Sequence, residues 1–582
     1  MTAQLLQEFE SLTSLLAADG ELITERLDHW ATTTPNKVFF HYGEDDVTLT
    51  YGEFGRATDA IAGNLAAQGV VKGDKVSVFS TNPLASALIM FAVWKAGAVY
   101  APVNFSFKGR LLIYQIDDTA PRLLITDPGL LPAVNSVAKD LQYVPTVVLY
   151  RPPEGRHDHV AEPDSIDSRF PVLSWDSLTA TAERPNVTVA FDDPANIVYT
   201  SGTTGPAKGV LQPYRWMASY TYNLRCPLSP EDVIYNDLPM YHVGGAIANV
   251  ARAAWVGCEV AVWDRFSPSA FWSRIAARGA TTAILLDVMV PWLMKAPESP
   301  NDRANTLNKV HMQPLPLHHH AVASRFGIDV VTAGFGQTES GAPLGIFIEE
   351  VSEGEGTPAA FYRGLPRSQI LDRVRAAGTP VLSGKDVNRK GIMGTSIPFV
   401  EVMVLDEHDR PCKVGQPGQL AIRPKLPGLI LTEYLGKPQA TVSAWRNLWF
   451  HTGDAAVLQA DGMFDFVDRL GDRIRVRGEN LSSFQVEDLL NQHANIQMTA
   501  VFSVPSSEGD EDSIAAFVVP MDGAVLTAEE LHEFSRSTMP KYMRPTYFRV
   551  VQEIPRTPTN KVEKYKLRAS LLAEIDHGVD PS

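Results

Sequence analysis

Residues 199–209 combine glycines, hydroxyl side chains and one lysine in a pattern suited to binding an anion. The glycines let the backbone turn tightly and approach a ligand closely. Hydroxyl groups donate hydrogen bonds, and the lysine adds a mobile positive charge. Gly209 follows the lysine where a Walker A loop needs Ser or Thr, so the pattern is of another kind. The alternative is a plain surface loop. We expect a polyphosphate-binding loop, formed by Thr200, Ser201, Gly202, Thr203, Thr204, Gly205 and Lys208.

Single polar and aromatic residues further along the chain could complete a nucleotide site. Glu339 offers a carboxylate, which Mg²⁺ prefers as a hard cation, and Thr338 beside it can donate to a phosphate. Phe335 presents a ring on which adenine could stack, with a core aromatic as the alternative. Asp454 has two acceptor oxygens that match two ribose hydroxyls, or it is a turn residue. Arg469 could bind ribose or phosphate, or form a surface salt bridge.

Lys561 belongs to a proline-rich segment from which its side chain could reach into a cleft. A lysine there can pair with negatively charged groups of a ligand. The alternative is that Lys561 is a solvated lysine like the basic residues that follow it.

The run His318–His320 contains three potential metal ligands. Adjacent side chains on a helix or strand point apart, so we expect no metal there.

Five motifs along the chain resemble, in identity and in order, those of the acyl-adenylate-forming superfamily. This superfamily contains acyl-CoA synthetases, adenylation domains of peptide synthetases and firefly-type luciferases. The resemblance covers roughly residues 25 to 570. Residues 477–483 and the loop 555–559 look most like crotonobetaine/carnitine–CoA ligases and medium-chain acyl-CoA ligases. The motifs are the phosphate-binding loop 199–210, a core motif 334–339, a ribose-binding motif 451–454, a hinge region 468–480 and a C-terminal lysine motif 555–561.

The resemblance implies a role for each matching residue. It implies that His242 lines the acyl pocket near the carboxylate, and that the catalytic residues are Lys561, Glu339, Thr204 and His242. It implies that Lys561 pairs with the incoming carboxylate and the α-phosphate, stabilising the charge that builds up as pyrophosphate leaves. It implies a magnesium ion on Glu339, a hinge at Gly471 and a coenzyme A channel at Gly478 and Glu479. Besides the phosphate loop, the residues implied to bind ATP or AMP are Gly334, Phe335, Gly336, Gln337, Thr338, Asp454 and Arg469.

Three positions depart from the family pattern. The hinge residue is usually Asp or Lys and here is Gly471, which can absorb a large change in backbone dihedral angles. Asn560 replaces the glycine that usually precedes the C-terminal lysine, and Asn tolerates left-handed geometry. Residues 310–314 read Val-His-Met-Gln-Pro, where relatives carry a Gly-Gly-Ala-like strand end beside adenine and substrate. The floor of the acyl pocket is therefore unusual, and the acid cannot be read from the sequence.

The elements that must position these residues alternate between helix and strand in the first half of the chain, which indicates an α/β domain with a largely parallel sheet. A surface loop is expected at 151–169, and at 349–389 either a lid or a plain loop with one helix at 367–377. The expected elements of the first half include a helix at 51–68, a strand at 75–79, a helix at 84–95, a strand at 99–102 and a strand at 197–200.

After residue 450 the pattern changes to that of a small α+β domain. The expected elements are a hairpin around Asp461-Gly462, a strand at 513–520, a helix that opens with the capping box 527–530, a strand at 547–554 and a basic C-terminal helix. We therefore expect an α/β protein with a large N-terminal domain of parallel-type sheets flanked by helices, residues 1–469, and a small mobile C-terminal domain, residues 470–582.

The composition fits a globular protein of more than one domain. The chain has 582 residues and a formal net charge of −16, which opposes nonspecific binding to nucleic acid or to anionic membranes. The apolar stretch 85–103 is interrupted by a lysine and a glycine, so we expect a helix and a strand rather than a membrane span. Residues 1–20 lack the basic region of a secretory signal. Three separated cysteines argue for a reducing compartment, and we expect a cytoplasmic protein.

The resemblance to the acyl-adenylate-forming superfamily, with the chemistry of the matching residues, implies an AMP-forming carboxylic acid–CoA ligase. ATP and the acid would give acyl-AMP and pyrophosphate, and coenzyme A would then take the acyl group and release AMP. The expected cofactors and substrates are ATP, Mg²⁺, coenzyme A and a small carboxylic acid. The alternative is a freestanding adenylation enzyme that loads a carrier protein, whereas a catalytically inactive nucleotide-binding protein would need neither Glu339 nor Lys561. We expect no nucleic-acid partner, and the oligomeric state is left open, with a homodimer as one alternative.

Overall fold

The helix that begins at Tyr51 starts at a capping box. In α3 (Tyr51–Ala67) the Thr50 hydroxyl accepts a hydrogen bond from the Glu53 amide, and the Glu53 carboxylate accepts one from the Thr50 amide. Amide groups that a helix start leaves unpaired are thereby satisfied. Strand β3 (Lys75–Phe79), helix α4 (Pro83–Lys95) and strand β4 (Val99–Pro102) follow, so the apolar stretch is a helix and a strand, as predicted. Among the described residues, no helix is both long enough and apolar enough to cross a membrane.

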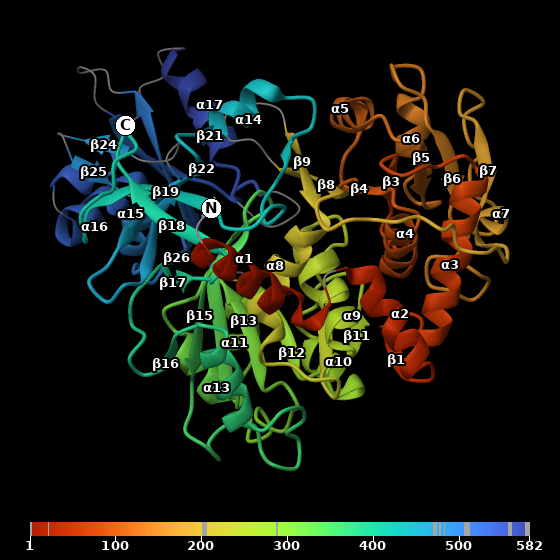
Figure 1. Cartoon of the computed structure of the whole chain (residues 1–582). Coiled ribbons are helices and arrows are strands. Elements are labelled where there is room, and N and C mark those ends of the chain that lie inside the picture. Colours follow the sequence, from red (N-terminus) through yellow and green to blue (C-terminus); the bar gives the residue numbers. More distant parts are fainter. Residues whose placement is uncertain are drawn as a thin grey trace. The chain divides into compact units, whose positions relative to one another are not determined.

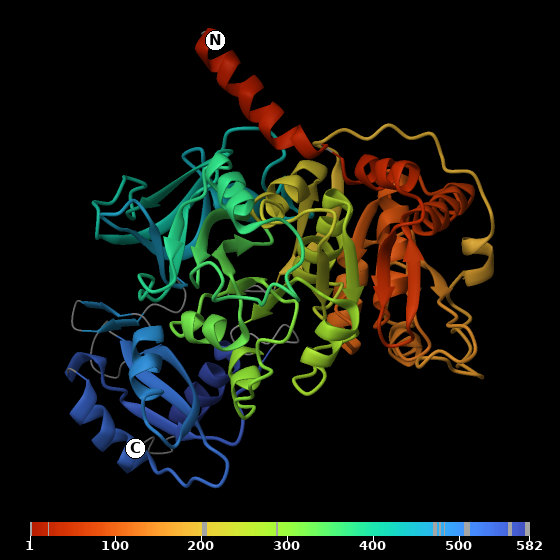
Figure 2. The same cartoon turned by 90° about the horizontal axis from the view of Figure 1, so that it is seen from below.

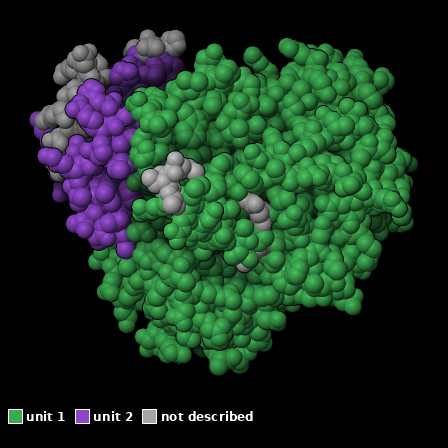
Figure 3. Space-filling model, viewed as in Figure 1, with its two compact units in different colours: residues 1–201, 206–402, 422–450 green, residues 202–205, 403–421, 451–582 purple. Residues whose placement is uncertain are grey.

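The computed structural model describes residues 3–20, 22–200, 207–286, 289–469, 474–476, 479–481, 483–505, 512–539, 541–556 and 562–576. Its contacts divide the chain into two compact units, shown in different colours in Figure 3. Unit 1 contains residues 1–201, 206–402 and 422–450, and unit 2 contains residues 202–205, 403–421 and 451–582. The expected domain boundary between residues 469 and 470 stays a prediction.

The first sheet of unit 1 carries the ends of the phosphate loop. Strands β7, β6, β5, β3, β4 and β8 are parallel neighbours in this order, and β9 and β20 extend the sheet in antiparallel fashion. The strands not yet given are β5 (Leu123–Thr126), β6 (Thr146–Leu149), β7 (Val172–Ser174), β8 (Pro194–Thr200), β9 (Lys208–Pro213) and β20 (Glu433–Tyr434).

Helices cover both faces of this sheet (Figure 1). Successive side chains of a strand point to opposite faces, and β5 shows the consequence. Leu123 and Ile125 pack in the cluster that contains side chains of α3 and α4. Leu124 packs on the other face with Leu112 of α5 (Gly109–Thr119) and Leu131 of α6 (Leu131–Val137). The two-sided burial explains why these strands are almost continuously apolar.

The second sheet of unit 1 carries the core motif. Parallel strands run in the order β1, β11, β10, β12, β13 and β14, and β2 and β15 are antiparallel to β1 and β14. Strands β16 and β17 both pair with β15. The bounds are β1 (Val38–Tyr42), β2 (Val47–Thr50), β10 (Val233–Asn236), β11 (Glu259–Val262), β12 (Thr282–Leu286), β13 (Lys309–Gln313), β14 (Val330–Gln337), β15 (Gly341–Glu349), β16 (Val381–Ser383) and β17 (Ile392–Ser396).

Further helices complete unit 1, and Figure 2 shows α1 projecting from it as a straight red helix. The π-helical segment η2 (Gly244–Ala251) runs directly into α9. Apart from α13, the described helices of unit 1 not yet given are α1 (Ala3–Leu16), α2 (Ile23–Thr33), α7 (Trp175–Thr179), α8 (Tyr214–Arg225), α9 (Arg252–Val256), α10 (Phe271–Arg278), α11 (Met289–Met294), α12 (His319–Phe326) and α14 (Pro438–Ala444).

The segment 349–389 is packed against the second sheet. Its helix α13 (Arg367–Ala376) matches the expected helix within one residue. Ile370 and Val374 of α13 are buried against Val330 of β14 and Phe347 of β15. The segment also adds β16 to the sheet edge. The described structure therefore gives this segment a packing role in the core of unit 1.

Unit 2 contains the expected hairpin and a small α+β layer. Strands β22 (Trp449–Leu458) and β23 (Phe464–Arg469) pair in antiparallel fashion around Gly462, whose φ of 80° suits glycine. Strand β27 pairs with β26 and β28, and helices α15 and α16 pack on one face of these strands while α17 packs on the other. The bounds are α15 (Ser483–Leu490), β26 (Ile496–Pro505), β27 (Asp512–Pro520), α16 (Ala528–Thr538), β28 (Tyr547–Val550) and α17 (Lys564–Asp576).

The remaining described strands lie between residues 400 and 481. Hairpin β24–β25 belongs to unit 2, and β18, β19 and β22 are neighbours in a sheet. The bounds are β18 (Val400–Leu405), β19 (Pro417–Pro424), β21 (Trp445–Arg446), β24 (Ile474–Val476) and β25 (Glu479–Leu481).

Candidate active site

The two ends of the expected phosphate loop are held side by side by the β8–β9 ladder. Thr200 is the last residue of β8 and lies opposite Lys208, the first residue of β9. Each end is therefore fixed by strand pairing. The predicted loop residues Ser201, Gly202, Thr203, Thr204 and Gly205 lie outside the described residues, and their roles stay predictions.

Glu339 of the core motif lies at the turn between β14 and β15, beside these loop ends. Its Oε1 accepts a hydrogen bond from the Tyr434 hydroxyl at 3.1 Å and a longer one from the Thr200 hydroxyl at 3.5 Å. The Leu431 amide donates to the Glu339 carbonyl at 2.7 Å, which fixes the backbone of the turn. Burial and the Glu339 charge raise the pKa of Tyr434, so the phenol stays protonated and donates.

The same aromatic ring positions the lysine of the loop. Nζ of Lys208 lies 4.6 Å from the centre of the Tyr434 ring, within the range of a cation–π contact. The Gln212 side chain donates to the Thr338 carbonyl at 2.8 Å, tying β9 to the core motif. The structure thus brings four predicted residues, Thr200, Lys208, Thr338 and Glu339, into one place.

A second polar network supports the loop ends from within unit 1. Tyr199, next to Thr200, donates to Asp118 at 2.8 Å, and Lys437 forms an ion pair with Asp118 at 2.7 Å. The Tyr114 hydroxyl donates to the Ala207 carbonyl at 2.7 Å. The network connects residues on both sides of the loop to α5, so it can hold the loop ends in fixed positions.

The core-motif strand β14 alternates between buried and half-buried residues as it approaches the turn. Phe335 is 8% exposed, and its stacking on adenine stays a prediction. Gly334, Gly336 and Gln337 are half-buried. A Cβ on Gly336 would lie 3.2 Å from the Gly341 carbonyl oxygen and 3.6 Å from Gln313, so these neighbours already fill the space beside the backbone and favour glycine here.

His242 occupies the turn before η2 and is half-buried. Its Nδ1 accepts a hydrogen bond from the Gly244 amide at 3.1 Å. In a neutral imidazole the ring hydrogen is therefore on Nε2, which suits donation to a carboxylate. The predicted contact with the acid is not tested by this geometry.

The unusual segment 310–314 forms the end of β13. His311 donates to or accepts from Thr332 of β14 through Nδ1 at 3.0 Å, and Nε2 lies 3.1 Å from Oε1 of Gln313. Burial lowers the pKa of His311 to about 4, so the ring is neutral near pH 7. Polar side chains therefore stand where the family carries glycine and alanine.

The ribose and hinge motifs belong to unit 2. Asp454 of β22 is 3% exposed and lies opposite Arg469 of β23. The Asp454 amide donates to the Thr452 hydroxyl at 3.1 Å, which fixes the local backbone. Glu479 belongs to β25. Gly471, Gly478 and Lys561 lie outside the described residues, and their roles stay predictions.

Sequence reasoning missed several residues that shape this site, namely Tyr114, Asp118, Tyr434 and Lys437. They are far in sequence from the motifs that they contact: Tyr434 lies 95 residues from Glu339, and Lys437 lies 319 residues from Asp118. A local motif carries no sign of such partners. In the sequence, only the closeness of Tyr434 and Lys437 on one short segment could have indicated that this segment contributes to the site.

The histidine run has a structural role, but the argument that its side chains point apart was wrong for two of them. His319 and His320 both reach Glu350, with Nδ1 to carboxylate distances of 2.5 and 3.1 Å. The His319 ring also contacts the Val387 carbonyl at 2.9 Å. Among the described residues, the histidine run is not in a cluster of three metal-ligating groups. The two rings instead fasten α12 to the end of β15.

The chain belongs to the AMP-binding enzyme family. The model of that family matches residues 27–429, and that of the AMP-binding enzyme C-terminal domain matches residues 485–561. The resemblance inferred from the five motifs is thereby confirmed, and so is the class of enzyme that it implied.

Curated relatives and solved structures agree with this assignment. The crotonobetaine/carnitine–CoA ligase of Citrobacter koseri is 26% identical over 562 residues, covering 94% of this chain and 99% of the relative. The enzyme of the same description from Escherichia fergusonii is 26% identical over 529 residues, covering 89% and 93%. ATP-bound MatB from Rhodopseudomonas palustris has a TM-score of 0.76 at 21% identity, covering 94% and 98%. The O-succinylbenzoate coenzyme A synthetase of Bacillus subtilis has a TM-score of 0.72 at 21% identity, covering 94% and 97%. The predicted fold class is confirmed by these structures.

Proposed function

We propose that this protein is an AMP-forming carboxylic acid–CoA ligase that uses ATP and Mg²⁺. The observation that carries the proposal is that Lys208 and Glu339 both contact Tyr434, while the Thr200 hydroxyl reaches the same Glu339 oxygen, beside the two ends of the glycine- and hydroxyl-rich loop. A cation, a carboxylate and hydroxyl groups at one place are what a metal–polyphosphate ligand requires.

In the first half-reaction, a carboxylate oxygen of the acid attacks the α-phosphorus of ATP, and the bond from that phosphorus to the pyrophosphate oxygen breaks. Lys208 binds the phosphates, and His242 donates through Nε2–H to the acid. Lys561 balances the charge that builds up as pyrophosphate leaves. Most of the rate enhancement comes from positioning and charge stabilisation.

Glu339 suits a magnesium ion, because its half-buried carboxylate adjoins the loop and has two acceptor oxygens for a hard cation. When bound, the ion would neutralise part of the phosphate charge. The Tyr434 hydroxyl holds the carboxylate in one orientation for this purpose.

In the second half-reaction, a thiol sulfur attacks the carbonyl carbon of acyl-AMP, the carbon–oxygen bond to the phosphate breaks, and the thiol proton passes to solvent. We expect residues 470–582 to rotate about Gly471 between the two steps, so that Lys561 leaves and Gly478 and Glu479 line the thiol channel. Coenzyme A is preferred to a carrier protein as the thiol because the curated relatives named above are CoA ligases.

Mass spectrometry tests the proposal. The protein is incubated with ATP, Mg²⁺ and a panel of carboxylic acids, with and without coenzyme A. Formation of acyl-CoA and AMP only when coenzyme A is present supports the ligase. Acyl-AMP without acyl-CoA indicates a carrier protein as acceptor, and ATP that stays intact with every acid contradicts adenylation.

The role of the metal ion is tested separately, since chelation with EDTA should stop the reaction. Glu339→Gln should slow it strongly, whereas Glu401→Gln, at a carboxylate paired with Arg423 outside the site, should not.

Two further properties belong to the proposal. The described cysteines are free, and Cys258 is buried, which fits a cytoplasmic location. Cell fractionation tests this location, and light scattering during gel filtration tests whether the protein is a homodimer.

A further inference from the structure

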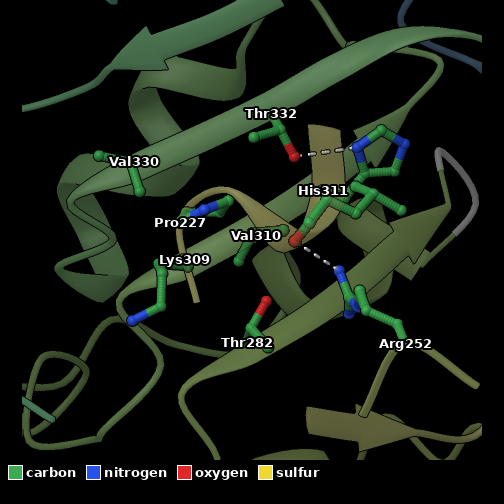
Figure 4. Close-up of a pocket in the computed structure, with 9 residues that line it drawn as sticks. Pro227, Arg252, Thr282, Lys309, Val310, His311, Val330 and Thr332 are labelled. Atoms are coloured by element: carbon green, nitrogen blue, oxygen red, sulfur yellow. Dashed lines mark hydrogen bonds between the residues drawn. The ribbon is translucent and has the colours of Figure 1, made fainter. Parts of the chain in front are cut away.

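Unit 1 contains a small cavity lined by two cationic side chains, between α8, α9 and strands β12 to β14 (Figure 4). Its polar lining comes from widely separated parts of the chain. The side chains that the argument uses are Leu224, Arg252, Thr282, Lys309, His311 and Thr332. The cavity therefore collects cationic and hydrogen-bonding groups in the interior of the unit, where a bare charge is costly.

Arg252 has a buried guanidinium with no counter-ion among the described residues. Its residue exposure is 2%, and its NH1 and NH2 groups donate to the Leu224 carbonyl at 3.4 Å and to the Asn249 side chain at 3.1 Å. Its Nε has no hydrogen-bond partner among the described residues, and none of their carboxylates lies within ion-pair distance. Burial lowers the pKa of Arg252 to about 10, so the guanidinium is still charged at neutral pH.

The other ionisable groups at the cavity do not neutralise this charge. Lys309 is paired with Asp232 at 2.8 Å, and the same carboxylate also accepts hydrogen bonds from Thr281 and Ser229. His311 is neutral near pH 7, because burial lowers its pKa to about 4. The cavity therefore has one positive charge in excess, and an anion entering it would be attracted.

A row of side chains connects this cavity with the core motif. On β13, His311 lines the cavity and contacts Gln313, which lies beside Gly336. On α8, Tyr220 lies beside Gly336 and Leu224, one turn later, lines the cavity. Two residues along a strand or four along a helix correspond to about 6–7 Å. The cavity is therefore one short acyl chain away from the core motif.

We propose that the acid substrate carries a second anionic group at its far end, and that Arg252 binds this group in the cavity. This inference rests on the proposed function. The spacing of about 6–7 Å matches a linear dicarboxylic acid of about six carbons. The same guanidinium would repel a cationic group, so this chain should not share the quaternary-ammonium acids that its relatives' names indicate.

Matched pairs of acids test the proposal on the full chain. Glutarate, adipate and pimelate are compared with pentanoate, hexanoate and heptanoate, and with γ-butyrobetaine as a cationic acid. Acyl-CoA and AMP are quantified by mass spectrometry. We expect kcat/KM for the best dicarboxylate to exceed that of its matched monocarboxylate by about tenfold or more, with the cationic acid the poorest. Equal values within each pair would overturn the inference and leave the ligase function intact.

Two variants separate recognition from structure. Arg252→Met removes the charge and should abolish the preference for the dicarboxylate while retaining turnover of the monocarboxylate. Arg252→Lys keeps the charge and should retain part of the preference. Arg278→Met removes a charge that is paired with Glu259 away from the cavity lining and should leave the preference unchanged. A preference that survives in Arg252→Met would overturn the inference.

A binding experiment covers the case in which no acid is turned over, which would contradict the proposed function itself. Isothermal titration of adipate into the wild-type protein and Arg252→Met then decides the inference separately. Binding that weakens about tenfold or more in the variant supports the anion site. Equal binding, or none to the wild type, overturns it. If Arg252→Met does not fold, Arg252→Gln, which also removes the charge but keeps hydrogen-bond donors, takes its place in this comparison.

Discussion

Tyr434→Phe is the change that most directly tests how the site is held. It removes the hydroxyl that donates to Glu339 at 3.1 Å but keeps the ring that lies 4.6 Å from the Lys208 ammonium. Tyr434 is 6% exposed, so water replaces the lost hydrogen bond poorly. The remaining side-chain hydrogen bond to this Glu339 oxygen, from Thr200 at 3.5 Å, is too long to hold the carboxylate.

The expected loss follows from the type of hydrogen bond removed. A hydrogen bond to a charged group contributes about 1.5–3 kcal/mol, and about 1.4 kcal/mol corresponds to a factor of ten in rate. If Glu339 must be oriented for adenylation, Tyr434→Phe should lower its rate about 10- to 150-fold. The rate should also need more Mg²⁺ to saturate, because a mobile carboxylate binds the ion less well.

Single-turnover formation of acyl-AMP at saturating ATP, measured over a range of Mg²⁺ concentrations, checks this expectation. Tyr42→Phe is the matched control, because the Tyr42 hydroxyl also donates to a carboxylate, Asp264, at 2.6 Å, but Tyr42 belongs to β1, which four strands separate from the core-motif strand β14 in the sheet. An unchanged rate and an unchanged Mg²⁺ dependence in Tyr434→Phe would refute the role of the tyrosine in positioning Glu339.

Three further predictions concern other parts of the chain. Lys561→Ala should lose pyrophosphate release but keep thioester formation from synthetic acyl-AMP, with Lys566→Ala as control; equal loss of both steps would contradict the assigned role. His157 lies 3.1 Å from Asp45 and 3.0 Å from Asp264, and although burial lowers its pKa, the hydrogen bond to Asp45 and both carboxylate charges raise it overall. A raised pKa in the folded state adds stability that is fully present below the ordinary histidine pKa of 6.5 and is lost as the pH rises through the raised pKa, so proteolysis of residues 151–169 should increase as the pH rises above 6.5. His157→Gln should not show this increase, and a wild type as insensitive as the variant would refute the prediction. Thr527→Ala removes the capping box of α16 and should cost about 1 kcal/mol, seen as roughly fivefold faster hydrogen exchange in residues 528–538. Thr538→Ala, at a hydroxyl bonded to the Phe534 carbonyl within the helix, is its control, and equal exchange in the two variants would contradict the prediction.

Elements with clear boundary signals could be predicted from the sequence almost to the residue. Strands β3 and β4 begin and end where expected, and α4 begins one residue earlier than expected, at Pro83, after the Asn82 cap. The strand expected at 547–554 is shorter, since β28 ends at Val550. Its partner β27 pairs with it only from Ala515 to Val518, and Ile554 is buried without belonging to the ladder. Hydrophobicity alone does not say where strand pairing stops.

The candidate site could be predicted only where its residues are close in sequence. The loop 199–209 and the core motif 334–339 each carry a local pattern that chemistry explains. Tyr434 and Asp118 become neighbours of those motifs only through the tertiary fold. Arg252 was missed for a different reason: an arginine on an apolar helix is ordinary in sequence, and what sets it apart is its burial with no counter-ion among the described residues.

The contact between Tyr434 and Glu339 also sets an order of events during synthesis. Strands β8 and β9 adjoin in sequence and can pair early, whereas the tyrosine that orients the carboxylate is translated 95 residues after it. At roughly 5–20 residues per second, that interval lasts about 5–20 s. A nascent or truncated chain that ends before Tyr434 therefore has the loop ends and the core motif but not the residue that joins them. ATP should bind weakly to such a chain, and nucleotide should stabilise only chains in which unit 1 is complete.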